Sequence, residues 1–228
     1  LGIWEHIRPA YQGVFRSLYV WDALAGTSIQ FDSAYLGKPQ MGFNVACAEL
    51  IRVLYERVRE HPLVTVMAPM KVARVLALES GQGYTVECED GTFLEPDCLI
   101  GADGGQSWLR KAIDLPCDSE PYAQDALFFR VRTTMWHREQ GWQVFYPTGP
   151  LALLPLSSPH ACAVVWSLPK ESAQAMSQMK LSDLTESLNQ RFGLHLGALS
   201  VLDSPRLVSL TRRHAKTYYR PGAVLVGD

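Results

Sequence analysis

Two short runs lie near the start of the chain: residues 19–22 are mostly apolar, and residues 28–32 alternate between polar and apolar. Alternation with a period of two is typical of β-strands that bury one face. The residues between the runs, Ala25-Gly26-Thr27, include a glycine that suits a tight connection. The pattern therefore predicts a β-hairpin.

Two other segments have the spacing of an amphipathic helix, with apolar residues every three or four positions. The first covers residues 47–58 and is stopped by Pro62, and the second covers residues 181–192 and closes at Gly193. Their apolar positions are Cys47, Leu50, Ile51, Leu54, Tyr55 and Val58 in the first helix, and Leu181, Leu184, Leu188 and Phe192 in the second.

The remaining apolar runs are short and bounded by glycine-containing turns, which predicts strands, including a β-meander before residue 95. Ser107 is expected to cap a short helix that ends near Ile113. Strands interleaved with helices indicate a mixed α/β fold. The predicted strands are 64–66, 72–78, 84–88, 92–94, 98–100, several between 127 and 168, 206–210 and 223–226.

Composition and charge exclude several classes of protein. The 228 residues are 47% hydrophobic and 19% charged, which is typical of a globular protein and excludes a disordered or collagen-like chain. The net charge of −2 gives no electrostatic reason to expect nucleic acid as a partner. No apolar run approaches the roughly 20 residues that a membrane-spanning helix needs.

The cysteines and histidines form no recognisable metal or disulfide pattern. Five cysteines are scattered without a C-x-x-C pair, and the six histidines do not cluster. We therefore expect reduced thiols, a cytoplasmic location and no metal site. The cysteines are Cys47, Cys88, Cys98, Cys117 and Cys162.

Both ends of the chain favour an internal piece of a longer protein. The chain starts at Leu1 without a methionine, and it stops directly after an apolar strand and the pair Gly227-Asp228. The last carbonyl groups of a buried strand need partners, so natural chains rarely stop there. A natural or processed terminus is the alternative.

Candidate chemistry lies at two turns in which glycine and aspartate follow an apolar strand. One contains Gly101, Asp103 and Gly104, and the other contains Gly227 and Asp228. Ligands of open α/β sheets gather at the carboxyl ends of the strands. Glycine lets the backbone approach a phosphate, and a short carboxylate accepts hydrogen bonds from sugar hydroxyls. Two such turns fit a nucleotide bound across a sheet edge.

Each turn taken alone also has a simpler interpretation. Asp-Gly is a common hairpin turn, so Asp103-Gly104 is also consistent with a plain turn. The phosphate-binding pattern G-x-G-x-x-G is absent from the chain. Gly81-Gln82-Gly83 begins like that pattern, but position 86 is valine and the segment joins two predicted meander strands.

The two turns lie within longer motifs that resemble a known family. Residues 101–110, Gly-Ala-Asp-Gly-Gly-Gln-Ser-Trp-Leu-Arg, resemble the G-A-D-G-x-x-S-x-x-R fingerprint of flavin-dependent aromatic hydroxylases, the para-hydroxybenzoate hydroxylase superfamily. Residues 220–228 resemble the second flavin motif of that family. Segments over the rest of the chain, including Val20-Trp21-Asp22 and residues 145–156, 165–169 and 210–215, are similar to the branch that acts in ubiquinone biosynthesis.

The resemblance implies a flavoprotein hydroxylase fold with FAD as cofactor. It assigns residues 1–16, 40–118 and 215–228 to a partial FAD-binding domain, and 17–39 and 119–214 to a substrate domain. By the matched motifs, Asp103 and Gly104 would serve FAD and the passing pyridine nucleotide, and Asp228 would bond the ribitol chain. Arg110 would brace the first turn or meet a phosphate, although a solvated helix arginine is equally consistent with the sequence.

The implied reaction is hydroxylation of an aromatic ring, here a polyprenylated ubiquinone precursor. NAD(P)H reduces the flavin, O2 adds to give a C4a-hydroperoxide, and one oxygen is transferred to the ring. No catalytic side chain is assigned, because the cofactor supplies the chemistry. The chain alone, without a phosphate-binding glycine loop, is expected to be inactive. The resemblance also leaves open a peripheral association with a membrane or a biosynthetic complex.

One segment departs from the family. Where the family usually has V-E-N followed by arginine, beside the flavin, this chain has Val45-Ala46-Cys47-Ala48. Small side chains replace polar ones, so we expect weaker binding of the flavin. This departure keeps a non-catalytic paralogue or scaffold as an alternative, beside a flavin hydroxylase that acts on another aromatic ring.

Aromatic residues of the predicted substrate domain are expected mostly in the core, and some of them in an apolar cavity for a prenylated ring. These residues are Trp136, Trp142, Phe145, Tyr146 and Trp166. His214, beside Arg212 and Arg213, is expected at a solvated or structural strand end, since no other titratable group is near it in the sequence.

Overall fold

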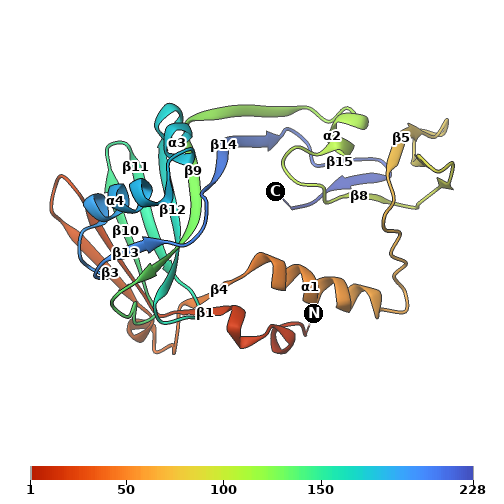
Figure 1. The fold of residues 1–228 in the computed structure, drawn as a ribbon. Helices are drawn as coiled ribbons and strands as arrows, with labels where there is room; N and C mark the ends of the chain where they lie inside the picture. Colours follow the sequence, from red (N-terminus) through yellow and green to blue (C-terminus); the bar gives the residue numbers. More distant parts are fainter. Residues whose placement is uncertain (1, 228) are drawn as a thin grey trace. The chain divides into compact units, whose positions relative to one another are not determined.

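The computed structural model describes residues 2–227, and its elements are shown in Figure 1. Contacts within the chain divide it into two compact units. The first contains residues up to Val64 together with Tyr122–Leu210, and the second contains Thr65–Pro121 together with the residues from Thr211 on. The sequence-based assignment of residues 1–16 and 40–64 to a cofactor-binding domain stays a prediction.

A large mixed sheet forms most of the first unit. Its strands are β2 (Ser17–Asp22), β3 (Ser28–Asp32), β9 (Cys117–Thr133), β10 (Gln140–Tyr146), β11 (Gly149–Pro155), β12 (Ala161–Pro169), β13 (Leu199–Val201) and β14 (Arg206–Ala215). The order is β13-β9-β12-β11-β10-β2-β3, and β14 also pairs with β9. Along this order, only β10 and β2 run parallel.

Two helices cover one face of this sheet, α3 (Lys170–Ser177) and α4 (Leu181–Phe192) (Figure 1). Strand β11 has one buried face for these helices to cover, because every second residue from Gly149 to Pro155 is buried. The side chains of Leu151, Leu153 and Trp166 pack against Leu184 and Leu188 from α4 in one core. Each fully buried leucine contributes about 1.5–3 kcal/mol of transfer free energy.

The opposite face of the same sheet carries exposed apolar side chains. Register places Val165 between Phe128 and Ala152, and Val20 opposite Ile29. Phe128 is 40% exposed and Ile29 is 55% exposed. A sheet that is apolar on both faces needs a partner for the second one.

The N-terminal part of the first unit joins a small sheet to a helix. It contains η1 (Trp4–His6), η2 (Pro9–Tyr11), β1 (Gln12–Phe15), η3 (Ser33–Leu36), β4 (Gly42–Val45) and α1 (Cys47–Arg59). Strand β1 pairs antiparallel with β4. A Cβ atom at Gly13 would lie 2.4 Å from the carbonyl oxygen of Pro155, so the close approach of β1 to β11 requires glycine.

The second unit contains two small sheets and one short helix. The strands β5 (Val72–Ala77), β6 (Tyr84–Cys88) and β7 (Phe93–Leu94) form an antiparallel meander. The other sheet has the order β15-β16-β8, from β15 (Tyr219–Arg220), β16 (Ala223–Leu225) and β8 (Leu99–Gly101), and α2 (Trp108–Ala112) follows β8. Strands β16 and β8 are parallel, so both end at the same edge.

Most elements predicted from the sequence are confirmed. The hairpin is β2–β3, the two amphipathic helices are α1 and α4, and the meander is β5–β7. The strand predicted at residues 64–66 is wrong, because that segment pairs with no other strand and forms none. Helix α3 was not predicted, since its few apolar residues give no clear period.

Strands β9 and β14 run from one unit into the other, and β14 is separated from β13 by residues 202–205. At this break Asp203 accepts a hydrogen bond of 2.7 Å from the backbone N–H of Arg130 and one of 2.6 Å from its side chain. The carboxylate therefore replaces a missing ladder bond of β9. In the described part of the chain, no helix has both the length and the apolar character for crossing a bilayer.

Candidate functional site

The turn after β8 is held by its own aspartate. Asp103 Oδ2 accepts hydrogen bonds of 2.7 Å from the N–H of Trp108 and 3.1 Å from the N–H of Leu109. Ser107 caps the same helix, as predicted, with its Oγ accepting from the N–H of Arg110 at 2.9 Å. Two side chains thus satisfy the free N–H groups at the start of α2.

The pKa of Asp103 lies below its ordinary value. Partial burial of the carboxyl acts to raise the pKa, but hydrogen bonds from the Ser107 hydroxyl and from the backbone N–H of Leu109 and Trp108 outweigh it. Asp103 is therefore an acceptor-only carboxylate at neutral pH, which is the state that a sugar hydroxyl requires.

Arg110 turns back onto the loop that precedes its helix. Its Nη1 donates a hydrogen bond of 2.9 Å to the carbonyl oxygen of Gly105. That contact fastens the guanidinium to the turn, and a contact of Arg110 with a phosphate stays a prediction.

The glycines of the two motifs serve different purposes. A Cβ atom at Gly101 would lie 2.7 Å from Leu109 Cδ2 and 2.9 Å from Leu225 Cδ2, so Gly101 allows α2 and β16 to pack on β8. Gly104 and Gly227 have φ values of +79° and +84°, and a Cβ there would meet nothing within 4 Å. The left-handed backbone explains glycine at both positions, and the space beside each glycine is open.

The two motifs line one pocket of about 180 Å³ within the second unit. The predicted residues Gly101, Asp103, Gly104, Arg110 and Gly227 all contribute to its wall. Asp228, the remaining predicted residue, lies outside the described residues. The parallel pairing of β8 with β16, Leu99 opposite Ala223, brings the motifs together although more than a hundred residues separate them.

Other wall residues were missed by the sequence-based search. Cys117, Arg213 and Tyr218 line the pocket, and Arg213 Cδ lies 3.6 Å from the place of a Cβ on Gly105. They come from the paired strands β9 and β14 and from the segment that follows β14. The signal for Arg213 was the pair Arg212-Arg213, but its direction depends on long-range strand pairing.

His214 lies at the edge of a second, polar hollow of about 260 Å³ in the same unit. Its Nδ1 lies 3.1 Å from the hydroxyl of Tyr218. Arg212 and Glu120, which also line this hollow, form an ion pair at 3.7 Å. The charges of Arg212 and Glu120 thus neutralise each other within this hollow.

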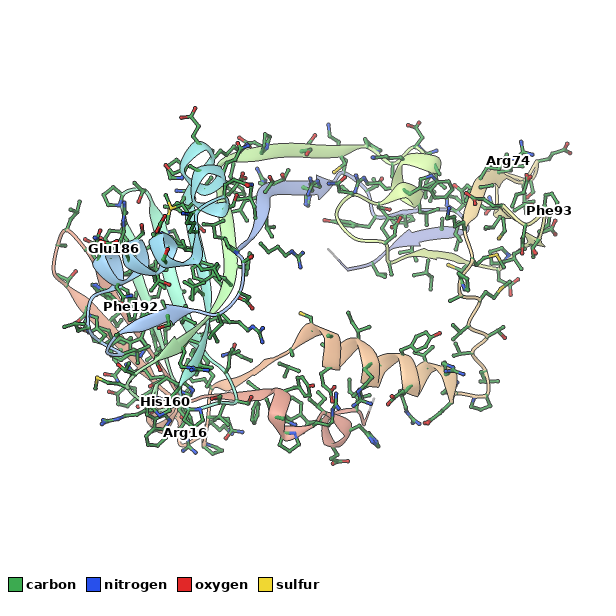
Figure 2. All side chains as sticks on the ribbon, in the orientation of Figure 1. Arg16, Arg74, Phe93, His160, Glu186 and Phe192 are labelled. Carbon is green, nitrogen blue, oxygen red and sulfur yellow. The ribbon has the colours of Figure 1, made fainter. Side chains whose placement is uncertain are left out.

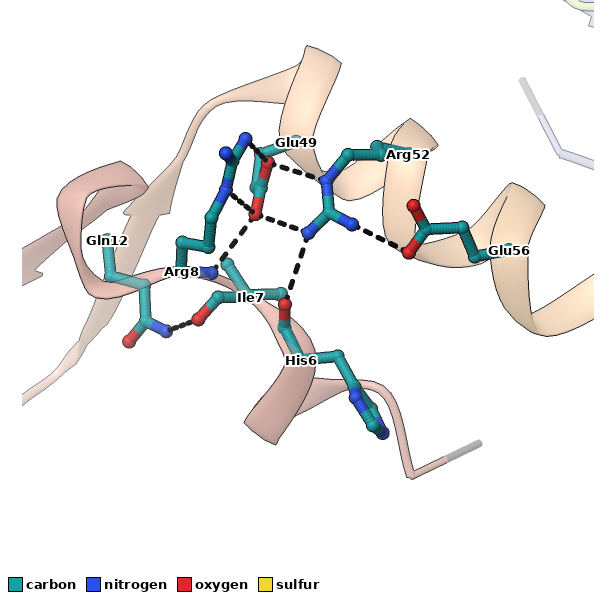
Figure 3. Close-up of polar contacts among 7 residues, drawn as sticks. All are labelled: His6, Ile7, Arg8, Gln12, Glu49, Arg52 and Glu56. Atoms are coloured by element: carbon teal, nitrogen blue, oxygen red, sulfur yellow. Dashed lines mark hydrogen bonds and ion pairs between the residues drawn. The ribbon is translucent and has the colours of Figure 1, made fainter.

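The N-terminus of α1, where the resemblance places a flavin contact, contains a network of charged residues (Figure 3). Glu49 is buried, and it accepts hydrogen bonds from Arg52 at 2.7 and 3.0 Å and from the side chain of Arg8 at 2.6 and 2.9 Å. Arg52 first, and then Arg8, hold the pKa of Glu49 well below its usual range. The network ties α1 to the segment before β1.

The departure at residues 45–48 is visible at the same helix end. Ala46 is the N-cap of α1 and offers no side-chain hydrogen bond, and Cys47 and Ala48 are exposed. This helix end therefore has small residues without a side-chain cap where the family pattern has polar ones.

Four of the five aromatic residues lie on the two faces of the large sheet, and the fifth, Trp136, lies in a loop. Trp166 is buried in the core, and Trp142 and Tyr146 pack against it, on the face that the helices cover. Phe145 is 44% exposed on the opposite face, and Trp136 is 54% exposed in the loop after β9.

Comparison with solved structures defines the class of protein by its fold. PqsL from Pseudomonas aeruginosa has a TM-score of 0.83 at 18% identity over 98% of this chain and 63% of its own. The p-nitrophenol 4-monooxygenase PnpA from Pseudomonas putida has a TM-score of 0.73 at 18% identity over 98% of this chain and 57% of its own. The fold is that of the flavoprotein hydroxylases, as predicted.

Sequence comparison then gives the family. The profile of the FAD binding domain family matches residues 11–228, so the chain belongs to that family. It is 30% identical to the 3-demethoxyubiquinol 3-hydroxylase of Escherichia coli over all of this chain and 57% of that protein. It is also 30% identical to the human ubiquinone biosynthesis monooxygenase COQ6 over 84% of this chain and 42% of that protein.

The pocket suits one part of an FAD molecule. The open backbone at Gly104 and Gly227 admits close approach, and Arg110 and Arg213 provide positive charge for a diphosphate. The Asp103 carboxylate can accept from a sugar hydroxyl. Pockets that enclose a whole drug-sized ligand exceed about 300 Å³, so the volume of about 180 Å³ fits a segment of the dinucleotide.

Proposed function

We propose that the protein is an FAD-dependent monooxygenase that hydroxylates the ring of a polyprenylated ubiquinone precursor. The observation that supports it most directly is the meeting of two distant glycine-aspartate motifs in one pocket. The chain spans 57% of the length of the first relative named above, so the activity of the whole protein is inferred.

Within the pocket, each residue has a distinct task. Asp103 and, beyond the described residues, Asp228 would accept hydrogen bonds from sugar or ribitol hydroxyls. Gly104 and Gly227, which have no side chain, would let the cofactor approach the backbone closely. Arg110 and Arg213 would neutralise the charge of the phosphates. Bound FAD, reduced by NAD(P)H, supplies the activation of O2.

The overall reaction balances without a nucleophilic side chain. One ring C–H becomes C–OH, NAD(P)H is oxidised to NAD(P)+, and O2 provides the hydroxyl oxygen and one water with the help of a proton. The protein binds the ring, orients it and excludes water.

The uncovered face of the large sheet would bind the substrate. It contains a hollow of about 250 Å³ that Val20, Ile29 and Phe145 line. A second hollow of about 320 Å³ lies beside Phe128 and Arg130. Both hollows combine apolar residues with polar ones, such as Asp22 in the first and Asp203 in the second. Their apolar residues suit a ring with a hydrocarbon chain. Such a substrate partitions into bilayers, so we also propose a peripheral association of the protein with a membrane.

The experiment uses the full-length protein. Its absorption spectrum is recorded for flavin, and it is then incubated with a short-chain polyprenyl quinol, NADH or NADPH, and ¹⁸O2. We expect a bound flavin and a product that gains one ¹⁸O atom by mass spectrometry. Oxidation of NAD(P)H that yields only hydrogen peroxide with this quinol and with other phenols would contradict a hydroxylase.

A pair of substitutions at neighbouring arginines tests whether Arg213 binds the diphosphate of FAD. Arg213→Met should weaken the binding of FAD about tenfold or more and leave the binding of riboflavin unchanged, because riboflavin has no phosphate. Arg212→Met, which removes the neighbouring arginine, should change neither. Equal losses for FAD and riboflavin would argue against a diphosphate at Arg213.

One observation favours a non-catalytic scaffold as a second candidate. The flavin-facing end of α1 has Ala46, Cys47 and Ala48 in place of polar residues. A scaffold would show no flavin absorption band even after addition of excess FAD, whereas the monooxygenase would show one.

A further inference from the structure

One end of the large sheet in the first unit is formed by four neighbouring loops. Residues 33–41 follow β3, 134–139 follow β9, 157–160 precede β12, and 194–198 precede β13. Strand register puts these loops at the same end, because Thr133 pairs with Leu199 and Ser17 pairs with both Asp32 and Gln140. Figure 2 shows Arg16 and His160 together at this end. We call it the loop rim.

The loop rim exposes large apolar side chains. Leu194 is 79% exposed, and Tyr35 and Leu36 are each 78% exposed. Trp136 and Met135 follow with 54% and 52%. Exposed apolar side chains that lie on one surface mark an interaction site, because the contact of apolar surface with water is unfavourable.

Hydrogen bonds fix the central loop of the rim in a single conformation. The buried His137 faces the Ser158 carbonyl oxygen with Nε2 at 2.9 Å, and its Nδ1 accepts from the N–H of Glu139 at 3.0 Å. The N–H of Met135 donates to the carbonyl oxygen of Leu196 at 3.0 Å, and Thr133 Oγ1 donates to the carbonyl oxygen of Met135 at 2.6 Å.

The same loop contains two consecutive residues with a left-handed backbone. Arg138 and Glu139, neither of them glycine, have φ values of +54° and +59°. Consecutive left-handed residues of this kind are retained only where the surroundings demand them. Trp136, which is 54% exposed, lies directly before this constrained part of the loop.

The positive charges at the loop rim favour binding to a negatively charged surface. Arg16 is paired with Glu139. Lys38 and Arg138 have no carboxylate within 4.0 Å among residues 2–227, and Arg138 is exposed. Cations that flank exposed apolar and aromatic residues are the combination that binds the headgroup region of an anionic bilayer.

We infer that the loop rim docks on the surface of an anionic membrane, with Leu36, Trp136 and Leu194 inserted among the lipid headgroups. Tyr35 and Trp136 suit the interface because their rings are apolar and their tips polar. Lys38 and Arg138 meet the lipid phosphates. This inference deepens the membrane association proposed above by assigning it to a surface.

The test measures binding of the full-length protein to vesicles, so it is independent of turnover. Cosedimentation is compared for phosphatidylcholine vesicles with and without phosphatidylglycerol. We expect binding to the anionic vesicles and about a tenfold or greater loss with the double variant Leu36→Ser, Trp136→Ser. Lys38→Glu with Arg138→Glu should weaken binding to a similar extent, and only to the anionic vesicles.

Leu24→Ser is the matched control, because Leu24 is 80% exposed but lies in the turn between β2 and β3, at the other end of the sheet. It should bind vesicles as the unchanged protein does. Equal losses for Leu24→Ser and the rim variant, or no binding to anionic vesicles, would overturn the inference. So would a dimer that the rim variant dissociates without any change in vesicle binding, since the rim would then join two copies of the chain. Failure of this test leaves the proposed hydroxylation untouched.

Discussion

Asp103 Oδ2 accepts a hydrogen bond of 2.7 Å from the N–H of Trp108, so the carboxylate predicted to bind the cofactor also fixes the start of α2. Oδ2 accepts both backbone hydrogen bonds from α2, and we predict that Oδ1 accepts from the ligand. A functional residue whose conformation is fixed in this way is already oriented before the ligand arrives.

This double role predicts different outcomes for two substitutions at position 103. Asp103→Asn keeps one oxygen that can cap α2 but removes the charge, so the thermal midpoint should change little. The affinity for FAD should fall about tenfold or more, because hydrogen bonds to charged groups contribute about 1.5–3 kcal/mol. Asp103→Ala should lose affinity and also about 1 kcal/mol of stability with the cap. Titration of FAD and thermal unfolding measure both. Unchanged affinity in Asp103→Asn would remove Asp103 from the cofactor site.

Much of this site could be predicted from the sequence because its parts are local. The turn of residues 101–107 and the cap at Ser107 depend on neighbours within a few residues. What the sequence did not reveal depends on distant pairing. Arg213 reaches the pocket only because β14 pairs with β9.

The fold shows the same division. The apolar spacing predicted the positions of β2, β3, α1 and α4. Only α4 buries most of its predicted apolar residues, because β3 is exposed from Ser28 to Phe31 and the buried residues of α1 are Glu49 and Val53. The segment 64–66 has the composition of a strand but no partner, and pairing cannot be read from a single segment. The break at Asp203 lies between β13 and β14, which both pair with β9, and no local pattern in the sequence predicts this pairing.

Asp203 should contribute to stability through the edge of β9. Asp203→Ala leaves the N–H of Arg130 without its 2.7 Å partner and should lower the free energy of unfolding by about 1 kcal/mol. Asp203→Asn keeps an accepting oxygen and should lose less. Asp118→Ala removes an ion pair with Lys216, at 3.3 Å, in which the aspartate is more exposed than Asp203, and should change stability by less than about 0.5 kcal/mol. Urea unfolding measures all three. If Asp118→Ala and Asp203→Ala cost the same, the ladder role of Asp203 is wrong.

His137 should make the loop rim sensitive to acid. Burial lowers the pKa of His137, and hydrogen bonds to nearby carbonyl groups oppose this without reversing it. The unfolded state therefore binds the proton more readily, so stability is complete above the ordinary histidine pKa of about 6.5 and is lost as the pH falls below it. Protonation also removes the acceptor that Nδ1 offers to the N–H of Glu139.

The matched variant for this prediction is His137→Gln, whose amide can donate to the Ser158 carbonyl but does not titrate in this range. Thermal midpoints between pH 7.5 and pH 5 should fall less in the variant than in the unchanged protein. His160→Gln, at an exposed histidine of the same rim, serves as the control and should keep the full pH dependence. A pH dependence that survives in His137→Gln would place the titrating group elsewhere.

The last prediction concerns the departure at the start of α1. Replacing Ala46 and Cys47 by Glu and Asn restores the residues that the family resemblance places beside the flavin, and we expect FAD to bind about tenfold more tightly to the full-length protein, as one new charge-assisted hydrogen bond would give. Ala46→Ser separates this effect from a better helix. It supplies the N-cap that α1 lacks and should raise stability by about 1 kcal/mol without changing the affinity for FAD. If Ala46→Ser tightens FAD as much as the double replacement does, the gain comes from ordering α1. If neither variant changes the affinity, the small residues at 46 and 47 do not limit the binding of the cofactor, and the main reason to consider a scaffold disappears.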